Sequence, residues 1–104
     1  MAEASKQVME FPLWEGEDVN FSAKRKSPIG KYIPFAPKTE AKIIFTSGKT
    51  IVEVPGVING SVASFTVRAD DVANVRNGAT WRVQFTIDGK NESPVTGKVV
   101  RKYV

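Results

Sequence analysis

The sequence of 104 residues contains neither cysteine nor histidine. Without cysteine the chain can form no disulfide and no thiolate metal site, and without histidine the imidazole ligands of zinc are missing too. The same absences exclude Ser-His-Asp and Cys-His nucleophiles and a histidine general base. Long apolar runs are also missing, which argues against a membrane-spanning helix. Glu3 and Glu10, with no apolar run between them, argue against a secretory signal.

The overall composition is that of an ordinary globular domain. Apolar residues make up 41% of the chain, aromatic residues 10% and charged residues 25%. Fifteen Lys and Arg against eleven Asp and Glu give a formal net charge of +4, which is too small by itself to indicate nucleic-acid binding. We therefore expect one small domain, residues 9–104, preceded by a polar N-terminal arm, residues 1–8.

Apolar and polar residues alternate with a period of two along most of the chain, as in strands with one buried and one exposed face. The clearest example is the segment 80–88, in which every second residue is apolar: Trp81, Val83, Phe85 and Ile87. Further strands are predicted at 7–14, 18–24, 41–46, 49–54, 61–68 and 98–104. The strand at 49–54 is expected to end at Pro55-Gly56.

Turn-forming residues separate these segments at intervals of about 8–12 residues, the spacing typical of sandwiches and barrels. They are Ser47-Gly48, Pro55-Gly56, Asn59-Gly60, Asn77-Gly78 and Asp88-Gly89. One stretch, 70–75, suits a short helical turn capped by Asp70. The pattern predicts an all-β fold: a single immunoglobulin-like β-sandwich of about seven antiparallel strands with one short helical turn.

The segment 24–38 departs from this pattern because it contains no acidic residue, three prolines and five basic residues: Lys24, Arg25, Lys26, Lys31 and Lys38. Tyr32, Ile33 and Phe35 stand among them. Prolines stiffen the chain, and connections of this length are often functional. The segment could dock on an acidic surface of a neighbouring subunit, stack on a nucleic-acid strand, or plug one end of the sandwich while its lysines remain in solvent.

For the first of these alternatives the residues expected in a protein interface are Lys24, Arg25, Lys26, Lys31, Tyr32 and Phe35. Trp14, beside the N-terminal arm, is a second expected anchor. Nucleic acid is disfavoured by the small net charge, and no membrane contact is expected. The arm could add a strand to the sheet of a neighbouring subunit.

Two acidic groups are better explained by structure than by chemistry. Glu15, Glu17 and Asp18 fit a solvated turn, because a calcium site needs six to eight oxygen ligands from a shaped loop. Asp70 and Asp71 fit the start of a helical turn, where carboxylates interact favourably with the helix dipole. The cap is the favoured interpretation of Asp70 and Asp71, because paired catalytic carboxylates normally face each other across a cleft.

Two basic motifs have equally plain interpretations. Ser47-Gly48-Lys49-Thr50 resembles the end of a phosphate-binding loop, but position 43 holds Ile43 where the first glycine should be, so a hairpin turn is predicted. The basic residues near the end, Lys98, Arg101 and Lys102, suggest an edge strand protected from aggregation by charge. No catalytic, cofactor-binding or metal-binding residue is predicted, and no cofactor is expected.

Three pieces of the chain resemble the small β-sandwich domains of bacteriophage tail and baseplate proteins. GEDVNFSAK resembles the first core strand of these domains, and KYIPFAPKTEAKIIFTS resembles their proline-bearing crossing and the next strand. The longest piece is GSVASFTVRADDVANVRNGATWRVQFTIDGK, in which a strand, an acidic turn and an aromatic-rich strand follow each other. The domains in question are the N-terminal domain of siphophage baseplate upper proteins and the related mycobacteriophage minor tail and virion β-sandwich domains.

The resemblance implies a structural role without catalytic residues. Such proteins usually carry a large C-terminal region, whereas this sequence stops at Val104, so we interpret it as a small accessory subunit. We expect a non-enzymatic structural subunit of a tailed-phage virion, synthesised in the host cytoplasm. It would be a minor tail or tail-associated protein, present in symmetric copies and contacting other virion proteins. The alternatives are a capsid decoration protein or a small carbohydrate- or nucleic-acid-binding module.

Overall fold

The described part of the computed structural model, residues 7–26 and 29–102, is built from eight strands and contains no helix. The strands are β1 (Gln7–Val8), β2 (Phe11–Trp14), β3 (Val19–Lys24), β4 (Glu40–Ser47), β5 (Thr50–Asn59), β6 (Val62–Val67), β7 (Thr80–Ile87) and β8 (Lys90–Lys102). The predicted all-β class is therefore confirmed. Within these residues no helix exists that could cross a lipid bilayer.

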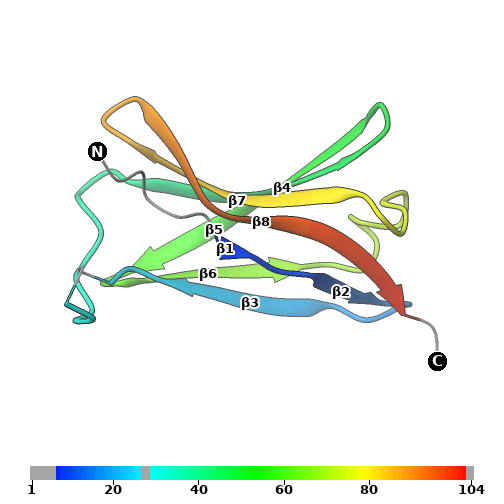
Figure 1. The fold of residues 1–104 in the computed structure, drawn as a ribbon, viewed down its shortest axis with the longest axis horizontal. Helices are drawn as coiled ribbons and strands as arrows, with labels where there is room; N and C mark the ends of the chain where they lie inside the picture. Colours follow the sequence, from blue (N-terminus) through cyan, green and yellow to red (C-terminus); the bar gives the residue numbers. More distant parts are fainter. Residues whose placement is uncertain (1–6, 27–28, 103–104) are drawn as a thin grey trace.

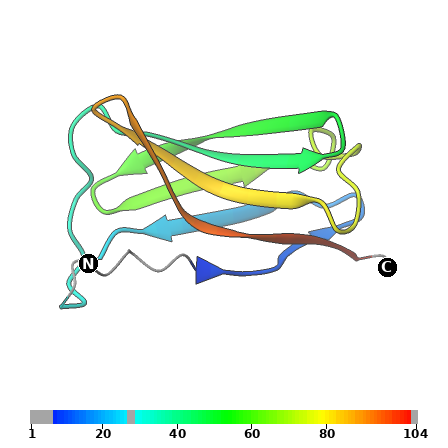
Figure 2. The ribbon, with the colours of Figure 1, turned by 45° about the horizontal axis from the view of Figure 1, so that its top comes forward.

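Hydrogen bonds join the strands in one curled sheet with the order β1-β8-β7-β4-β5-β6-β3, while β2 pairs with the end of β8. Figures 1 and 2 show that the sheet folds over into two layers, with β4, β7 and β8 in one layer and β3 and β6 in the other. The pairs β3–β6, β4–β7 and β7–β8 are antiparallel, as expected for an immunoglobulin-like sandwich. Unlike the prediction, β1 and β2 run parallel to β8.

Strand β5 belongs to both layers, because it does not end at Pro55-Gly56 as predicted. Its first part pairs with β4 up to Pro55, and its second part pairs with β6 from Gly56 to Asn59. The chain thus changes layers at this dipeptide. A Cβ at Gly56 would lie 2.4 Å from the ring of Phe65, so glycine is needed for the crossing. The reversal follows at Gly60, where φ is 62°.

The core fills the space between the two layers and contains the alternating residues of the strands. Trp81, Val83 and Phe85 of β7 are buried, as the sequence pattern predicts. At the centre, the ring of Phe11 lies 4.9 Å from Trp81 and 5.3 Å from Phe45 between centroids, both in edge-on geometry. Strand β2 therefore contributes Phe11 to the centre of the core.

Between β1 and β2 the chain crosses β8 at Gly97. The indole Nε1 of Trp81 donates a hydrogen bond to the carbonyl oxygen of Met9 at 2.9 Å. A Cβ on Gly97 would lie 1.7 Å from the same oxygen, so the crossing requires glycine. Gln7 and Val8, which we expected in a free arm, form β1, and the rest of the arm lies outside the described residues.

The connection between β6 and β7, where one short helical turn was predicted at 70–75, consists of hydrogen-bonded turns. The amide of Asp71 donates to the carbonyl of Arg68 at 3.0 Å, and Val75 donates to Val72 at 3.0 Å. Val72 and Val75 are both buried in the core. Because each of these bonds spans three residues and no longer series follows, the segment stays a chain of turns that closes one end of the sandwich.

Side chains from other parts of the described chain hold these turns, among them Arg101 and Asp18. Arg101 of β8 donates from Nε to the carbonyl of Val75 at 2.7 Å and from its guanidinium group to the carbonyl of Val72. Strand β8 pairs with β7 on one side and with β1 and β2 on the other, so the prediction of an edge strand protected by charge is wrong. Arg101 itself is half-buried. From its place on β8, the side chain of Arg101 reaches the carbonyl groups of these turns. The periodicity of the sequence does not reveal this contact. The carboxylate of Asp18 accepts a hydrogen bond from the amide of Ala69 at 2.9 Å.

Candidate functional site

The connection between β3 and β4, which we call the tip loop (residues 24–38), projects from one end of the sandwich. Figure 1 shows it in cyan at the left end, close to the turn that joins β5 and β6. The structure describes the loop except for residues 27–28. It contains six of the seven residues predicted for an interface, so its geometry decides how they can act.

Backbone hydrogen bonds anchor both legs of the tip loop to the turn between β5 and β6. The amide of Arg25 donates to the carbonyl of Ser61 at 2.8 Å, and the amide of Phe35 donates to the carbonyl of Gly60 at 2.9 Å. The two legs also meet each other, because the amide of Ile33 donates to the carbonyl of Arg25 at 3.1 Å. These bonds fix the leg that contains Pro34 and Pro37, and the described legs of the loop form an ordered protrusion.

Two of the predicted interface residues pack against the domain. Phe35 is half-buried and stacks on Phe85 of β7, with 4.9 Å between ring centroids. The guanidinium of Arg25 lies 6.0 Å from the centre of the Phe35 ring and donates to the carbonyl of Pro34 at 3.2 Å. Phe35 thus plugs this end of the sandwich, and Arg25 braces the loop.

The other four residues predicted for an interface at the tip, Lys24, Lys26, Lys31 and Tyr32, are exposed to solvent. Tyr32 is 54% exposed, and two ammonium groups lie near its ring: Lys24 Nζ at 5.4 Å and Lys26 Nζ at 5.1 Å from the centroid. Lys31 and Ile29 are exposed as well. Neither Lys24 nor Lys26 forms an ion pair with a carboxylate of the described residues. The tip therefore combines an accessible aromatic ring with the positive charges of Lys24 and Lys26, which no described carboxylate pairs with.

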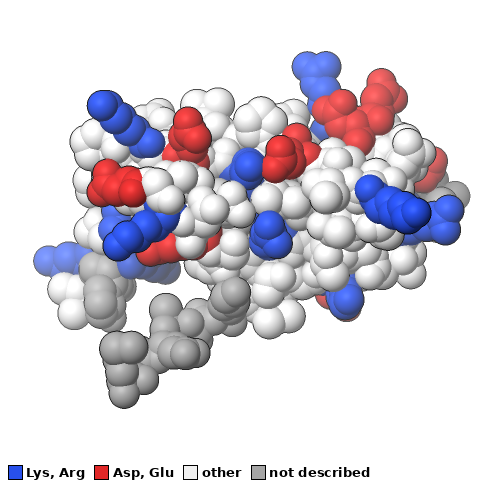
Figure 3. Space-filling model, turned by 90° about the horizontal axis from the view of Figure 1, so that it is seen from above, with Lys and Arg blue, Asp and Glu red and all other residues white. Residues whose placement is uncertain are grey.

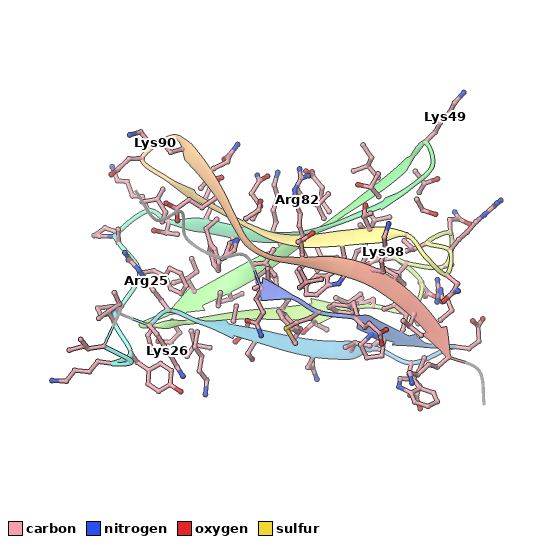
Figure 4. The ribbon with its side chains drawn as sticks, in the orientation of Figure 1. Arg25, Lys26, Lys49, Arg82, Lys90 and Lys98 are labelled. Atoms are coloured by element: carbon pink, nitrogen blue, oxygen red, sulfur yellow. The ribbon has the colours of Figure 1, made fainter. Side chains whose placement is uncertain are left out.

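A hollow of about 210 Å³ lies at the base of the tip loop, where it meets the hairpin of β7 and β8. We call it the tip hollow. Its apolar lining comes from Phe35, Phe85, Ile87 and Pro94, and its polar lining comes from Lys24, Arg25, Lys26 and Glu92. Figure 4 labels Arg25 and Lys26 at this end of the molecule. The hollow can hold an apolar group next to negatively charged groups.

Trp14, the seventh predicted residue, lies at the opposite end of the sandwich. It is 41% exposed because β2 alternates between inward and outward side chains, and Lys102 Nζ lies 5.4 Å from its ring. A turn follows, in which the amide of Glu17 donates to the carbonyl of Trp14 at 3.2 Å and Gly16 has φ of 74°. The structure thus divides the predicted residues between two ends.

The broad face formed by β4, β7 and β8 has a different character. Figure 3 views the molecule from above and shows basic and acidic side chains interspersed, with no continuous stripe of one sign. Lys42 and Glu53 form an ion pair there at 2.8 Å. At the far end, the segment Ser47–Thr50 is a hairpin turn between β4 and β5, as predicted. No group of three or more acidic side chains in the described chain could hold a metal ion.

The fold and the tip define a class of protein: a β-sandwich domain that presents a reinforced basic-aromatic loop. The sequence profile of the LtfC-like, beta-sandwich domain family matches residues 6–102, so the chain belongs to this family. The family is phage-associated, in agreement with the bacteriophage resemblance of the sequence. No curated protein matches the chain.

Proposed function

We propose that this protein is a non-enzymatic structural subunit of a tailed-phage virion, a minor tail or tail-associated protein that acts through contacts with other virion proteins. Its membership of a phage-associated family supports a role in phage particles. The observation that carries the proposal is the tip, where Lys24 and Lys26 lie beside the exposed Tyr32 ring and pair with no carboxylate of the described residues. The mechanism is binding alone.

The tip is suited to binding a protein because folding of the domain already orders the backbone of its described legs. Its legs are hydrogen-bonded to the turn at Gly60 and Ser61, and Phe35 fixes its base against Phe85. A partner therefore meets side chains on a fixed backbone, which reduces the entropy lost on association. Tyrosine, exposed here as Tyr32, is also among the residue types enriched at the sites that contribute most binding energy in protein interfaces.

The charge pattern favours an acidic protein surface over nucleic acid. A nucleic-acid strand requires a track of cations along several phosphates. The broad face next to the tip carries mixed charges, and Glu92 contributes to the tip hollow. On this face carboxylates interrupt the basic side chains, so a local acidic patch on a neighbouring subunit fits the tip better than a continuous phosphate backbone does.

A double charge reversal at the tip tests this function in the phage that carries the gene. Lys24→Glu with Lys26→Glu is expected to lower the amount of the protein in purified virions at least about tenfold, because like charges then face each other. The matched control is Lys49→Glu with Lys98→Glu, which changes the net charge equally at exposed sites away from the tip. Immunoblots of purified particles measure incorporation.

Normal incorporation of the tip variant would contradict the proposal, provided that circular dichroism shows the variant to be folded. The same preparations give the copy number per particle by quantitative mass spectrometry. Tens of copies or fewer agree with a tail protein, whereas hundreds of copies would mean capsid decoration instead.

A further inference from the structure

The end of the molecule opposite the tip carries a turn with complementary chemistry. We call residues 14–18 the acidic turn. Exposed Trp14 is followed by Glu15, Glu17 and Asp18, all exposed. Glu15 and Glu17 have no ion-pair partner among the described residues. The acidic turn therefore presents an aromatic side chain next to two unpaired carboxylates.

The lining of the tip hollow is complementary to an aromatic side chain that is accompanied by carboxylates. Its apolar lining includes Phe35 and Phe85, and an apolar or aromatic side chain is the occupant that such a lining accepts. Lys24 Nζ and Lys26 Nζ lie 5.4 and 5.1 Å from the Tyr32 ring centre, so two positive charges border the same exposed ring. Incoming carboxylates would relieve their mutual repulsion.

We propose that the tip hollow of one copy of this chain binds the acidic turn of a second copy, so that the copies associate head to tail. The proposal deepens the function proposed above and rests on it, because it assigns the tip a partner. Trp14 enters the hollow, and Glu15 and Glu17 lie against Lys24 and Lys26.

The position of the two surfaces suits such a contact. Strand β3 connects them directly, since the acidic turn precedes Val19 and the tip loop starts at Lys24. The molecule is 40 Å long, and Figure 1 shows β3 extending along the long axis between these ends. Each copy thus has one donor end and one acceptor end. A contact between unlike surfaces produces a ring if its rotation closes and a filament if it does not.

The expected affinity is low, because one turn in one hollow buries a small area. Interfaces below about 1,200 Å² are typical of weak and transient complexes. Exposed charge pairs are also screened by salt, so association should weaken between low and high ionic strength. In an assembled particle, repeated copies and neighbouring proteins would add avidity to this weak contact.

A charge-swap experiment on the purified full chain tests the contact by sedimentation equilibrium. The tip variant is Lys24→Glu with Lys26→Glu, and the turn variant is Glu15→Lys with Glu17→Lys. Each variant alone is expected to associate at least about tenfold more weakly than the wild type, because one half of the contact carries the wrong sign. An equimolar mixture should associate again, because each tip then meets a turn of opposite charge.

Two further variants separate the proposed contact from general charge effects. Lys49→Glu with Lys98→Glu has the same net charge as the tip variant and should associate like the wild type. Trp14→Ala leaves all charges in place and should weaken association at least about tenfold through loss of the anchor. Added salt should not restore the association of Trp14→Ala.

Two results would overturn the inference. One is a wild-type chain that remains monomeric up to about 1 mM, the weakest affinity that the experiment can detect. The other is a mixture of the two charge-swapped variants that remains as dissociated as each variant alone. If the tip variant is nevertheless lost from virions, the proposed function stands, and the tip binds a different virion protein.

Discussion

The N-terminal crossing and the tip loop are two irregular parts of the same sandwich, and they use their aromatic residues in opposite ways. At the crossing, the Met9 carbonyl accepts a hydrogen bond from the buried Trp81 and packs against Gly97. At the tip, backbone hydrogen bonds of similar length hold the loop, but Tyr32 remains exposed. Similar anchoring thus contributes stability in one place and an accessible surface in the other. Substitutions in the two regions should separate these roles.

The largest expected loss of stability is at Phe11, a core residue of β2 that lies next to the N-terminal crossing. Phe11→Ala removes a side chain that is 2% exposed and contacts the rings of Phe45 and Trp81. The free energy of unfolding should fall by about 4 kcal/mol, as for other buried aromatic residues cut to alanine. Urea denaturation followed by tryptophan fluorescence measures this change. Trp14→Ala on the same strand is the control and should cost about 1 kcal/mol or less.

The next largest loss of stability is expected at Gly97, whose backbone lies against the carbonyl oxygen of Met9. Gly97→Ala places a methyl group against the Met9 carbonyl, so β1 and β2 must move away from β8. We expect a loss of about 3 kcal/mol in the free energy of unfolding. Gly48→Ala is the comparison, because a Cβ there meets nothing within 4 Å and only the positive φ of 59° is unfavourable. Equal losses for the two variants would refute the role of the crossing.

A smaller effect is expected where Arg101 holds the turns between β6 and β7. Arg101→Met keeps much of the side-chain bulk but leaves the carbonyls of Val72 and Val75 without this donor. The expected loss is about 2 kcal/mol, the size of a hydrogen bond to a charged group. Lys98→Met, at an exposed position of the same strand, should leave the urea midpoint almost unchanged.

The smallest effect on stability is expected at the tip. Tyr32→Ala removes an exposed ring whose contacts with Lys24 and Lys26 are open to water. The change in the free energy of unfolding should stay within about 0.5 kcal/mol. A loss as large as that of Phe11→Ala would mean that the tip is part of the core and not a display surface. Thermal unfolding by circular dichroism is sufficient for this comparison.

The sequence pattern predicted the strands and turns well where local chemistry determines them. Alternation around Trp81 and Phe85 identified β7, and Asp88-Gly89 forms the expected reversal, with positive φ at both residues. Period-two alternation reveals which face of a strand is buried but not which strand lies beside it. The parallel pairing of β2 with β8 therefore remained hidden, because its partners lie far apart in the sequence.

Failures of prediction occurred where a residue serves a distant contact. Gly56 was interpreted as a turn glycine, but it makes room for the Phe65 ring at the layer crossing. For the candidate site, composition selected the tip loop correctly as an unusual segment. It could not separate Phe35, which packs on Phe85, from Tyr32, which is exposed. Only the three-dimensional structure shows which aromatic side chain of the loop packs on the domain and which faces solvent.

The parallel pairing of β1 and β2 with β8 also has a mechanical consequence. These strands contain the first and last residues of the described chain, and they run side by side in the same direction. A pull on β2 toward its start and on β8 toward its end loads their shared hydrogen bonds in shear, all at once, and cannot open them one after another. We therefore expect the hydrogen bonds between β2 and β8 to resist forced extension of the domain.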